Sequence, residues 1–150
     1  DMFERGRRIK RSINIDVNSC KRLKTEDLDL LAEIDILADY INERKKELST
    51  LDQSAFNSTR YMTNIGTFRK YIHYYLSNHP EICDKNTLLI RQLDEKGEGI
   101  PLELYCFTHN TGWLPNEEIK ADIFDHLYTI LSEFGLKIYQ KPTGDFSLNK

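Results

Sequence analysis

Three residues in the last third of the 150-residue chain could carry out acid–base or metal chemistry. Asp122, Asp125 and His126 lie within "ADIFDHLYTILSEFGL", residues 121–136. Two carboxylates beside an imidazole could move a proton or bind a metal ion. On a helix the apolar residues of this stretch share one face, Asp125 points away from that face, and His126 lies at its boundary. We therefore expect a solvated helix flank, with a ligand or catalytic role as the less favoured alternative.

No other stretch has the spacing of a catalytic or metal motif. The chain lacks Gly-x-Ser-x-Gly, a phosphate-binding Walker loop, Cys-x-x-Cys and His-Glu-x-x-His. The segment "TNIGTFRK", residues 63–70, could hold an anion at a helix start, but ordinary capping explains it more simply. We expect no enzyme activity, no cofactor and no metal.

The three cysteines also argue against a disulfide framework. Cys20, Cys83 and Cys106 are odd in number and have unrelated spacings. This usage is typical of reduced thiols in the cytosol, packed as small hydrophobic residues.

Charge is distributed unevenly along the sequence. Residues 1–24 contain eight Lys or Arg and three Asp or Glu, a net charge of +5, and the remaining residues have a net charge of −8. Four of these cations, Arg7, Arg8, Lys10 and Arg11, form one short run. Such a run could contact phosphate groups or line a passage for ions, and a solvated strand face is an equally good explanation.

The periodicity of the sequence predicts the elements that position these residues. Residues 7–17 alternate, with Ile9, Ile13, Ile15 and Val17 on one side, as in a half-buried strand. Residues 25–48 predict one long charged helix with Thr25 as a candidate cap. We expect a mobile loop at 49–66. A second amphipathic helix ends at the "SNHP" of residues 77–80; its repeating apolar residues are Phe68, Tyr71, Ile72, Tyr75 and Leu76.

The second half of the chain predicts a hairpin, a helix and a last strand. The hairpin strands are residues 87–93 and 100–107, and Pro101 suggests an edge strand or a strand entry. The helix would begin after Asn116 as its N-cap and stop at Gly135. Its apolar face would contain Ile119, Ile123, Phe124, Leu127, Ile130, Leu131 and Phe134. A strand at 136–140 and a tail complete the chain.

These elements predict an α+β fold. Without the helical insert after the first strand, the order is βαββαβ, a ferredoxin-like sandwich. We divide the chain into residues 1–20 with the first strand, an insert and loop at 21–66, and the remainder of the α/β domain at 67–150.

A ferredoxin-like order also allows a stand-alone module that binds RNA or a small ligand. Tyr105 and Phe107 share one face of a predicted strand, where bases could stack. However, "LELYCF" lacks the glycine- and base-containing aromatic motif of RNA-recognition modules, and this part of the chain is acidic. The RNA module is therefore an alternative, and we expect no nucleic-acid partner.

Three segments in order resemble the small-conductance mechanosensitive channel family (MscS-like), and most closely its larger, miniconductance-type branch. They are "GRRIKRSINID", "TNIGTFRKYIHYYLSNHP", and the stretch from "RQLDEKGEGIPLELYCF" to "ADIFDHLYTILSEFGLKIYQKPTG". The resemblance covers nearly all of the chain except the insert at about residues 21–60.

The resemblance implies a cytoplasmic domain of a channel in the bacterial inner membrane. In that family seven identical subunits form a hollow cage below the pore, ions and small solutes pass through side portals, and membrane tension opens the pore in osmotic stress. The membrane-spanning helices and most of a β-domain would then precede this chain, with residues 1–20 including the end of the β-domain. Arg7, Arg8, Lys10 and Arg11 would form a basic patch at a portal or between subunits.

Overall fold

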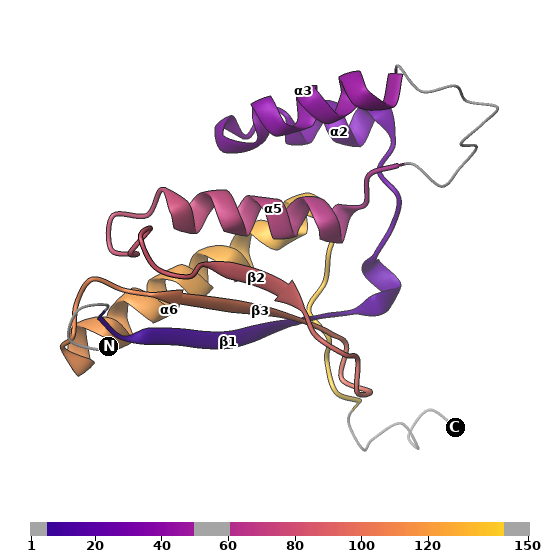
Figure 1. Ribbon diagram of the computed structural model, residues 1–150. Coiled ribbons are helices and arrows are strands. Elements are labelled where there is room, and N and C mark those ends of the chain that lie inside the picture. Colours follow the sequence, from indigo (N-terminus) through magenta and orange to yellow (C-terminus); the bar gives the residue numbers. More distant parts are fainter. Residues whose placement is uncertain (1–5, 50–60, 143–150) are drawn as a thin grey trace.

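The computed structural model describes residues 6–49 and 61–142, which form a mixed α and β structure (Figure 1). Its three-stranded antiparallel sheet has the order β1-β3-β2. The described residues form strands β1 (Arg8–Ile15), β2 (Leu89–Gln92) and β3 (Ile100–Phe107), helices α2 (Thr25–Leu31), α3 (Asp35–Ser49), α5 (Asn64–Ser77) and α6 (Trp113–Ile130), and 3-10 turns η1 (Val17–Ser19) and η2 (Leu131–Phe134). Within these ranges, no helix has both the length and the apolar content needed to cross a bilayer.

The pairing of β1 with β3 forms the centre of the core. Ile9 lies opposite Cys106 and Ile13 opposite Leu102, and all four are buried. The predicted alternation of β1 is thus confirmed up to Ile15. Val17 was expected to continue the strand and is instead 54% exposed in η1. The strand ends because the side chain of Asp16 accepts a hydrogen bond from the backbone of Asn18 and caps this turn.

Helices α5 and α6 supply the other half of the core. Phe68, Ile72 and Leu76 of α5 are fully buried, as predicted from their spacing. The predicted apolar face of α6 and η2 is also confirmed, since Ile123, Phe124, Leu127, Leu131 and Phe134 are all buried. Gly135 ends this unit with a φ of 73°, a left-handed conformation that glycine adopts without strain.

The predicted long helix at 25–48 is divided into α2 and α3. On one straight helix, Leu28 and Leu31 would lie on roughly the opposite side from Leu37 and Ile41. The break between Leu31 and Asp35 turns both pairs toward the core, and all four side chains are buried there. Thr25 is the first helical residue and not the cap, a position that Lys24 occupies.

The predicted start of the last helix is wrong, whereas the predicted strand entry at Pro101 is confirmed. Helix α6 begins at Trp113 with Gly112 as its N-cap, four residues before the helix start predicted from Asn116. Asn116 is instead a buried member of the first turn, where its amide donates to the carbonyls of Asn110 and Gly112. Pro101 lies at the entry of β3, which is the central strand and not an edge.

The expected last strand is reduced to one isolated bridge, Ile15 to Ile138. Two backbone bonds flank it, from Asp16 to Lys137 and from Tyr139 to Asn14. The amide of Lys137 donates to the hydroxyl of Ser19 and not to the backbone of β1, which interrupts the ladder. The observed fold is therefore α+β with three strands in the described residues. The loop expected at 49–66 is too long, because residues 64–66 form the first turn of α5. Residues 50–60 of this loop and 143–150 of the tail lie outside the described residues.

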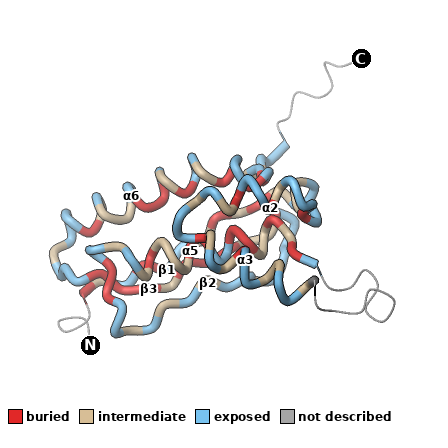
Figure 2. The backbone as a smooth tube through the Cα atoms, turned by 90° about the horizontal axis from the view of Figure 1, so that it is seen from above, coloured by how far each residue is buried: buried red, intermediate tan, exposed pale blue. Residues whose placement is uncertain are grey.

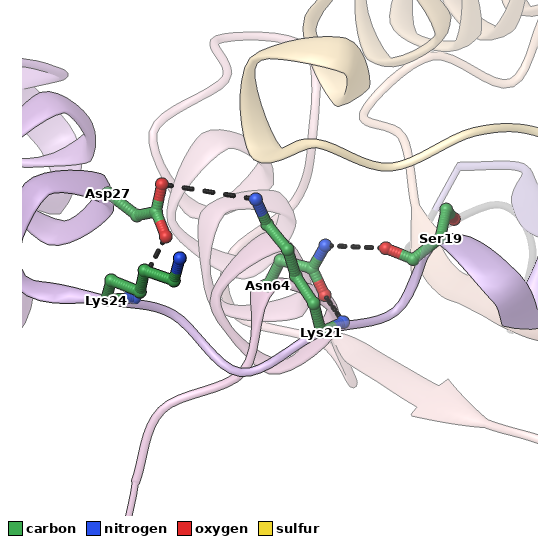
Figure 3. Close-up of polar contacts among 5 residues, drawn as sticks. All are labelled: Ser19, Lys21, Lys24, Asp27 and Asn64. Atoms are coloured by element: carbon green, nitrogen blue, oxygen red, sulfur yellow. Dashed lines mark hydrogen bonds and ion pairs between the residues drawn. The ribbon is translucent and has the colours of Figure 1, made fainter.

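A buried amide side chain joins the insert to the rest of the domain (Figure 3). Asn64, the first residue of α5, is fully buried; it donates to the carbonyl of Ser19 and accepts from the amide of Lys21. Next to it, Arg22 forms a bridge with Thr63. The chain leaving toward α2 and the chain entering α5 are therefore held side by side.

We predict that Asn64→Ala lowers the free energy of unfolding by about 2–3 kcal/mol, because it removes a fully buried amide and leaves the carbonyl of Ser19 and the amide of Lys21 without this partner. Chemical denaturation followed by circular dichroism measures the change. Asn42→Ala, at an exposed position of α3, is the matched control and should change stability by less than about 0.5 kcal/mol. Equal effects of the two substitutions would contradict the role given to Asn64.

Candidate functional site

The side chains of Asp122, Asp125 and His126 do not converge on a common point. Both aspartates are exposed, and the imidazole turns toward α5, where its Nε2 lies 2.6 Å from the hydroxyl of Tyr71. The ring also stacks on Tyr75 with 4.5 Å between centroids. Within the described residues, no three His, Cys, Asp or Glu side chains form a group that could hold a metal ion.

Burial keeps this histidine–tyrosine contact neutral. Burial raises the pKa of Tyr71 to about 12, with smaller contributions from Tyr75 and Glu133. Burial also lowers the pKa of His126, and Glu133 only partly opposes this shift. A neutral imidazole with its proton on Nδ1 accepts a hydrogen bond from the Tyr71 hydroxyl at Nε2. The pair thus joins α5 to α6 by a hydrogen bond, a structural role.

The cysteines are placed as small core residues. Cys83 and Cys106 are buried and Cys20 is half-buried, all as free thiols. Burial raises the pKa of Cys106 to about 12, so its thiol remains protonated and a poor nucleophile at neutral pH.

The four cations of the basic run do not form one patch. Along β1 alternate side chains point to opposite faces. Arg11 lies on the core side, with its guanidinium 4.2 Å from the centre of the Phe124 ring of α6. Arg7 precedes the strand, and its Nε donates to the carbonyl of Thr111. Only Arg8 and Lys10 share the opposite face of the sheet.

That opposite face is the candidate site, which we call the open sheet face: Arg8 and Lys10 of β1, Tyr105 and Glu103 of β3, and Leu89 and Arg91 of β2. Strand β2 has three exposed residues of four and is largely pale blue in Figure 2. Lys10 is directly opposite Tyr105 in the register. The guanidinium of Arg8 lies 5.8 Å from the centre of the Tyr105 ring.

The charge of the open sheet face comes mainly from Arg8 and Lys10. Arg91 donates to Glu103 over 2.8 Å, so these two charges compensate each other. Neither Arg8 nor Lys10 has an ion-pair partner among the described residues. A half-buried aromatic ring beside two exposed cations can stack against planar groups, and the cations attract anions.

The sequence placed Tyr105 on one face of its strand but missed Leu89 and Arg91 as neighbours. The signal that could have found them is the hairpin register, which sets Leu89 opposite Tyr105 and Arg91 opposite Glu103. Of the four predicted basic residues, the structure brings Arg8 and Lys10 together and separates Arg7 and Arg11 from them.

A scan against protein-family models finds none that matches this chain.

We predict that His126 makes folding stability depend on pH. Its pKa in the folded chain is below the ordinary value of 6.5, so the unfolded chain binds a proton at a higher pH than the folded chain does. Stability should therefore fall as the pH is lowered through about 6.5 toward the folded pKa.

Denaturant unfolding at several values between about pH 7.5 and pH 5 measures this dependence. His126→Gln should lose less stability over this range than the parent chain. Burial also lowers the pKa of His79. His79→Gln, which leaves the Tyr71 contact intact, should retain the loss due to His126, and the double variant should show the smallest dependence. A parent chain and His126→Gln with equal pH profiles would contradict the prediction.

Proposed function

We propose that this chain is the cytoplasmic vestibule domain of an MscS-like mechanosensitive channel of the miniconductance-type branch. The three ordered segments that resemble this family support the proposal. The main structural support for the proposal is the position of β1, which lies between β3 and the segment at Ile138. A split βαββαβ sheet has this neighbour order, with its last strand beside its first. The ferredoxin-like assignment is part of the same proposal.

In this role the chain catalyses no reaction. Its function is to enclose the route that ions and small solutes take between the cytoplasm and the pore, as one of seven copies. Arg8 and Lys10 on the open sheet face would act on passing ions through their electric field, which raises the local concentration of anions and lowers that of cations. Arg11 is less suited to this task because it packs on Phe124.

Patch-clamp recording from the complete product of the gene that encodes this chain tests the proposal. Expressed in bacterial spheroplasts without their own mechanosensitive channels, it should give currents that open under stepped suction in patch-clamp recordings. Spheroplasts carrying the empty vector are the control. Absence of a tension-dependent current from protein present in the membrane would contradict the proposed function.

Charge reversal on the open sheet face tests the role of the two cations. We predict that Arg8→Glu with Lys10→Glu shifts the permeability ratio toward cations by about threefold or more, read from the reversal potential in a salt gradient. Lys85→Glu with Lys137→Glu makes the same charge change at exposed positions outside this face and should shift the ratio less. Equal shifts would indicate a general effect of net charge.

A second candidate function is binding of single-stranded RNA, because Tyr105 lies on the open sheet face of the central strand with Arg8 and Lys10 beside it. Proteins that bind single strands combine such stacking rings with cations. The acidic charge of the rest of the chain opposes this function. We expect only weak, strongly salt-dependent binding without sequence preference. Sub-micromolar, sequence-selective binding at about 150 mM salt would favour the RNA module instead.

A further inference from the structure

Exposed apolar side chains gather at the start of α6. Trp113 and Leu114 are each 63% exposed, although large apolar residues are usually covered. Trp113 lines a groove of about 260 Å³, which we call the α6 groove. Its other lining residues are Arg7, Arg8, Ile9, Asn116, Glu117 and Lys120. The guanidinium of Arg8 lies beside Tyr105 on the open sheet face, and Lys120 pairs with Glu117 over 3.1 Å. Arg7 therefore supplies the net positive charge beside the apolar wall of the groove.

The turn between α2 and α3 has the complementary character. Leu30 is 66% exposed and Ile36 is 37% exposed on either side of this turn. Residues 25–43 contain seven acids and no Lys or Arg, the acids being Glu26, Asp27, Asp29, Glu33, Asp35, Asp39 and Glu43. We call Leu30, Glu33, Ile36 and Asp39 the acidic turn. Glu33 follows Leu30 by three residues, Asp39 follows Ile36 by three residues, and both acids are exposed.

The two surfaces of one copy cannot meet each other. Helices α2 and α3 lie on the outer side of α5, whereas the start of α6 lies near the N-terminal end of β1 (Figure 1). The view from above also separates α2 and α3 from that end of the molecule (Figure 2). A contact between the acidic turn and the α6 groove therefore requires two copies.

We propose that the α6 groove of one copy binds the acidic turn of a second copy of this chain. Leu30 and Ile36 would cover the exposed ring of Trp113, and Glu33 and Asp39 would face Arg7 and Lys120 at the rim of the groove. Burial of apolar surface supplies the attraction, and the opposite charges orient the contact. The inference needs only these described residues and does not rest on the proposed channel role.

The geometry sets the strength and the symmetry of this contact. A stable interface buries about 800 Å² on each partner, more than a turn and one groove provide. We therefore expect a weak contact that salt screens. Because two different surfaces meet, each pair of copies leaves one groove and one turn free, so the contact is heterologous and can extend into a ring or a chain.

The single tryptophan of the chain reports directly on the groove. As the protein concentration rises, its emission maximum should move to shorter wavelength and acrylamide should quench it less. The expected dissociation constant is about 10–500 µM at low salt, weaker at high salt. Trp emission that is independent of concentration over this range would overturn the proposal.

Complementary charge variants test the pairing of the two surfaces. Glu33→Lys with Asp39→Lys reverses the turn and keeps the groove; Arg7→Glu with Lys120→Glu reverses the groove and keeps the turn. Each variant alone should self-associate at least about tenfold more weakly than the parent. A mixture should associate again, because the groove of the first variant meets the acidic turn of the second. Adding Trp113→Phe to the second variant leaves the first as the only source of emission.

Asp84→Lys with Asp94→Lys makes the same change in net charge as the turn variant, at exposed positions outside both surfaces, and should retain association. Circular dichroism on each variant excludes unfolding as the cause. A mixture of the two reversed variants that fails to associate, or a control that loses association equally, would overturn the proposal. Loss of tension-gated current would leave it unaffected, since these measurements use the chain in solution.

Discussion

The antiparallel pairing of β1 with β3 is the constraint on which the rest of the structure depends. It joins residues some ninety positions apart in the sequence and buries Ile13 and Leu102 completely. A shift of one residue in this register would turn every β1 side chain to the opposite face, exposing three isoleucines and burying Arg8 and Lys10. The burial of those isoleucines therefore also decides where the cations lie, because an unpaired buried charge costs far more than an exposed one.

The insert between β1 and α5 is attached to this core by two different means. Leu28, Leu31, Leu37 and Ile41 bury apolar area in the shared core, and the break after Leu31 makes this possible. Apolar contacts have little directionality, so they tolerate small shifts. Asn64 adds direction, since its amide fits only one arrangement of the carbonyl of Ser19 and the amide of Lys21. The polar junction thus fixes the position of helices that the apolar contacts stabilise.

The sequence predicted those elements whose signal is local periodicity. The alternation of β1 and the apolar faces of α5 and α6 were correct, because burial on one face imposes a regular spacing. The errors arose where a specific polar contact decided the outcome. Asn116 suits an N-cap by residue type, but its bonds to Asn110 and Gly112 place it one turn inside the helix. Residues 136–140 have the residue pattern of a strand. However, the amide of Lys137 donates to the hydroxyl of Ser19, and this contact interrupts the ladder with β1. Long-range contacts of this kind leave no periodic signal.

The candidate site could be predicted only in part for the same reason. The basic run was evident, but strand alternation divides it, and only Arg8 and Lys10 share the open sheet face. The neighbouring strand adds Arg91 and, through the same register, its compensating partner Glu103. The site therefore has an effective charge of about +2, although the sequence contains four cations within residues 7–11. Two exposed charges in water interact weakly with any single anion, whose attraction to each is about 1 kcal/mol at contact. Such a face is poorly suited to tight binding of one ligand and better suited to a collective effect, in which several copies arranged around a common space add their fields.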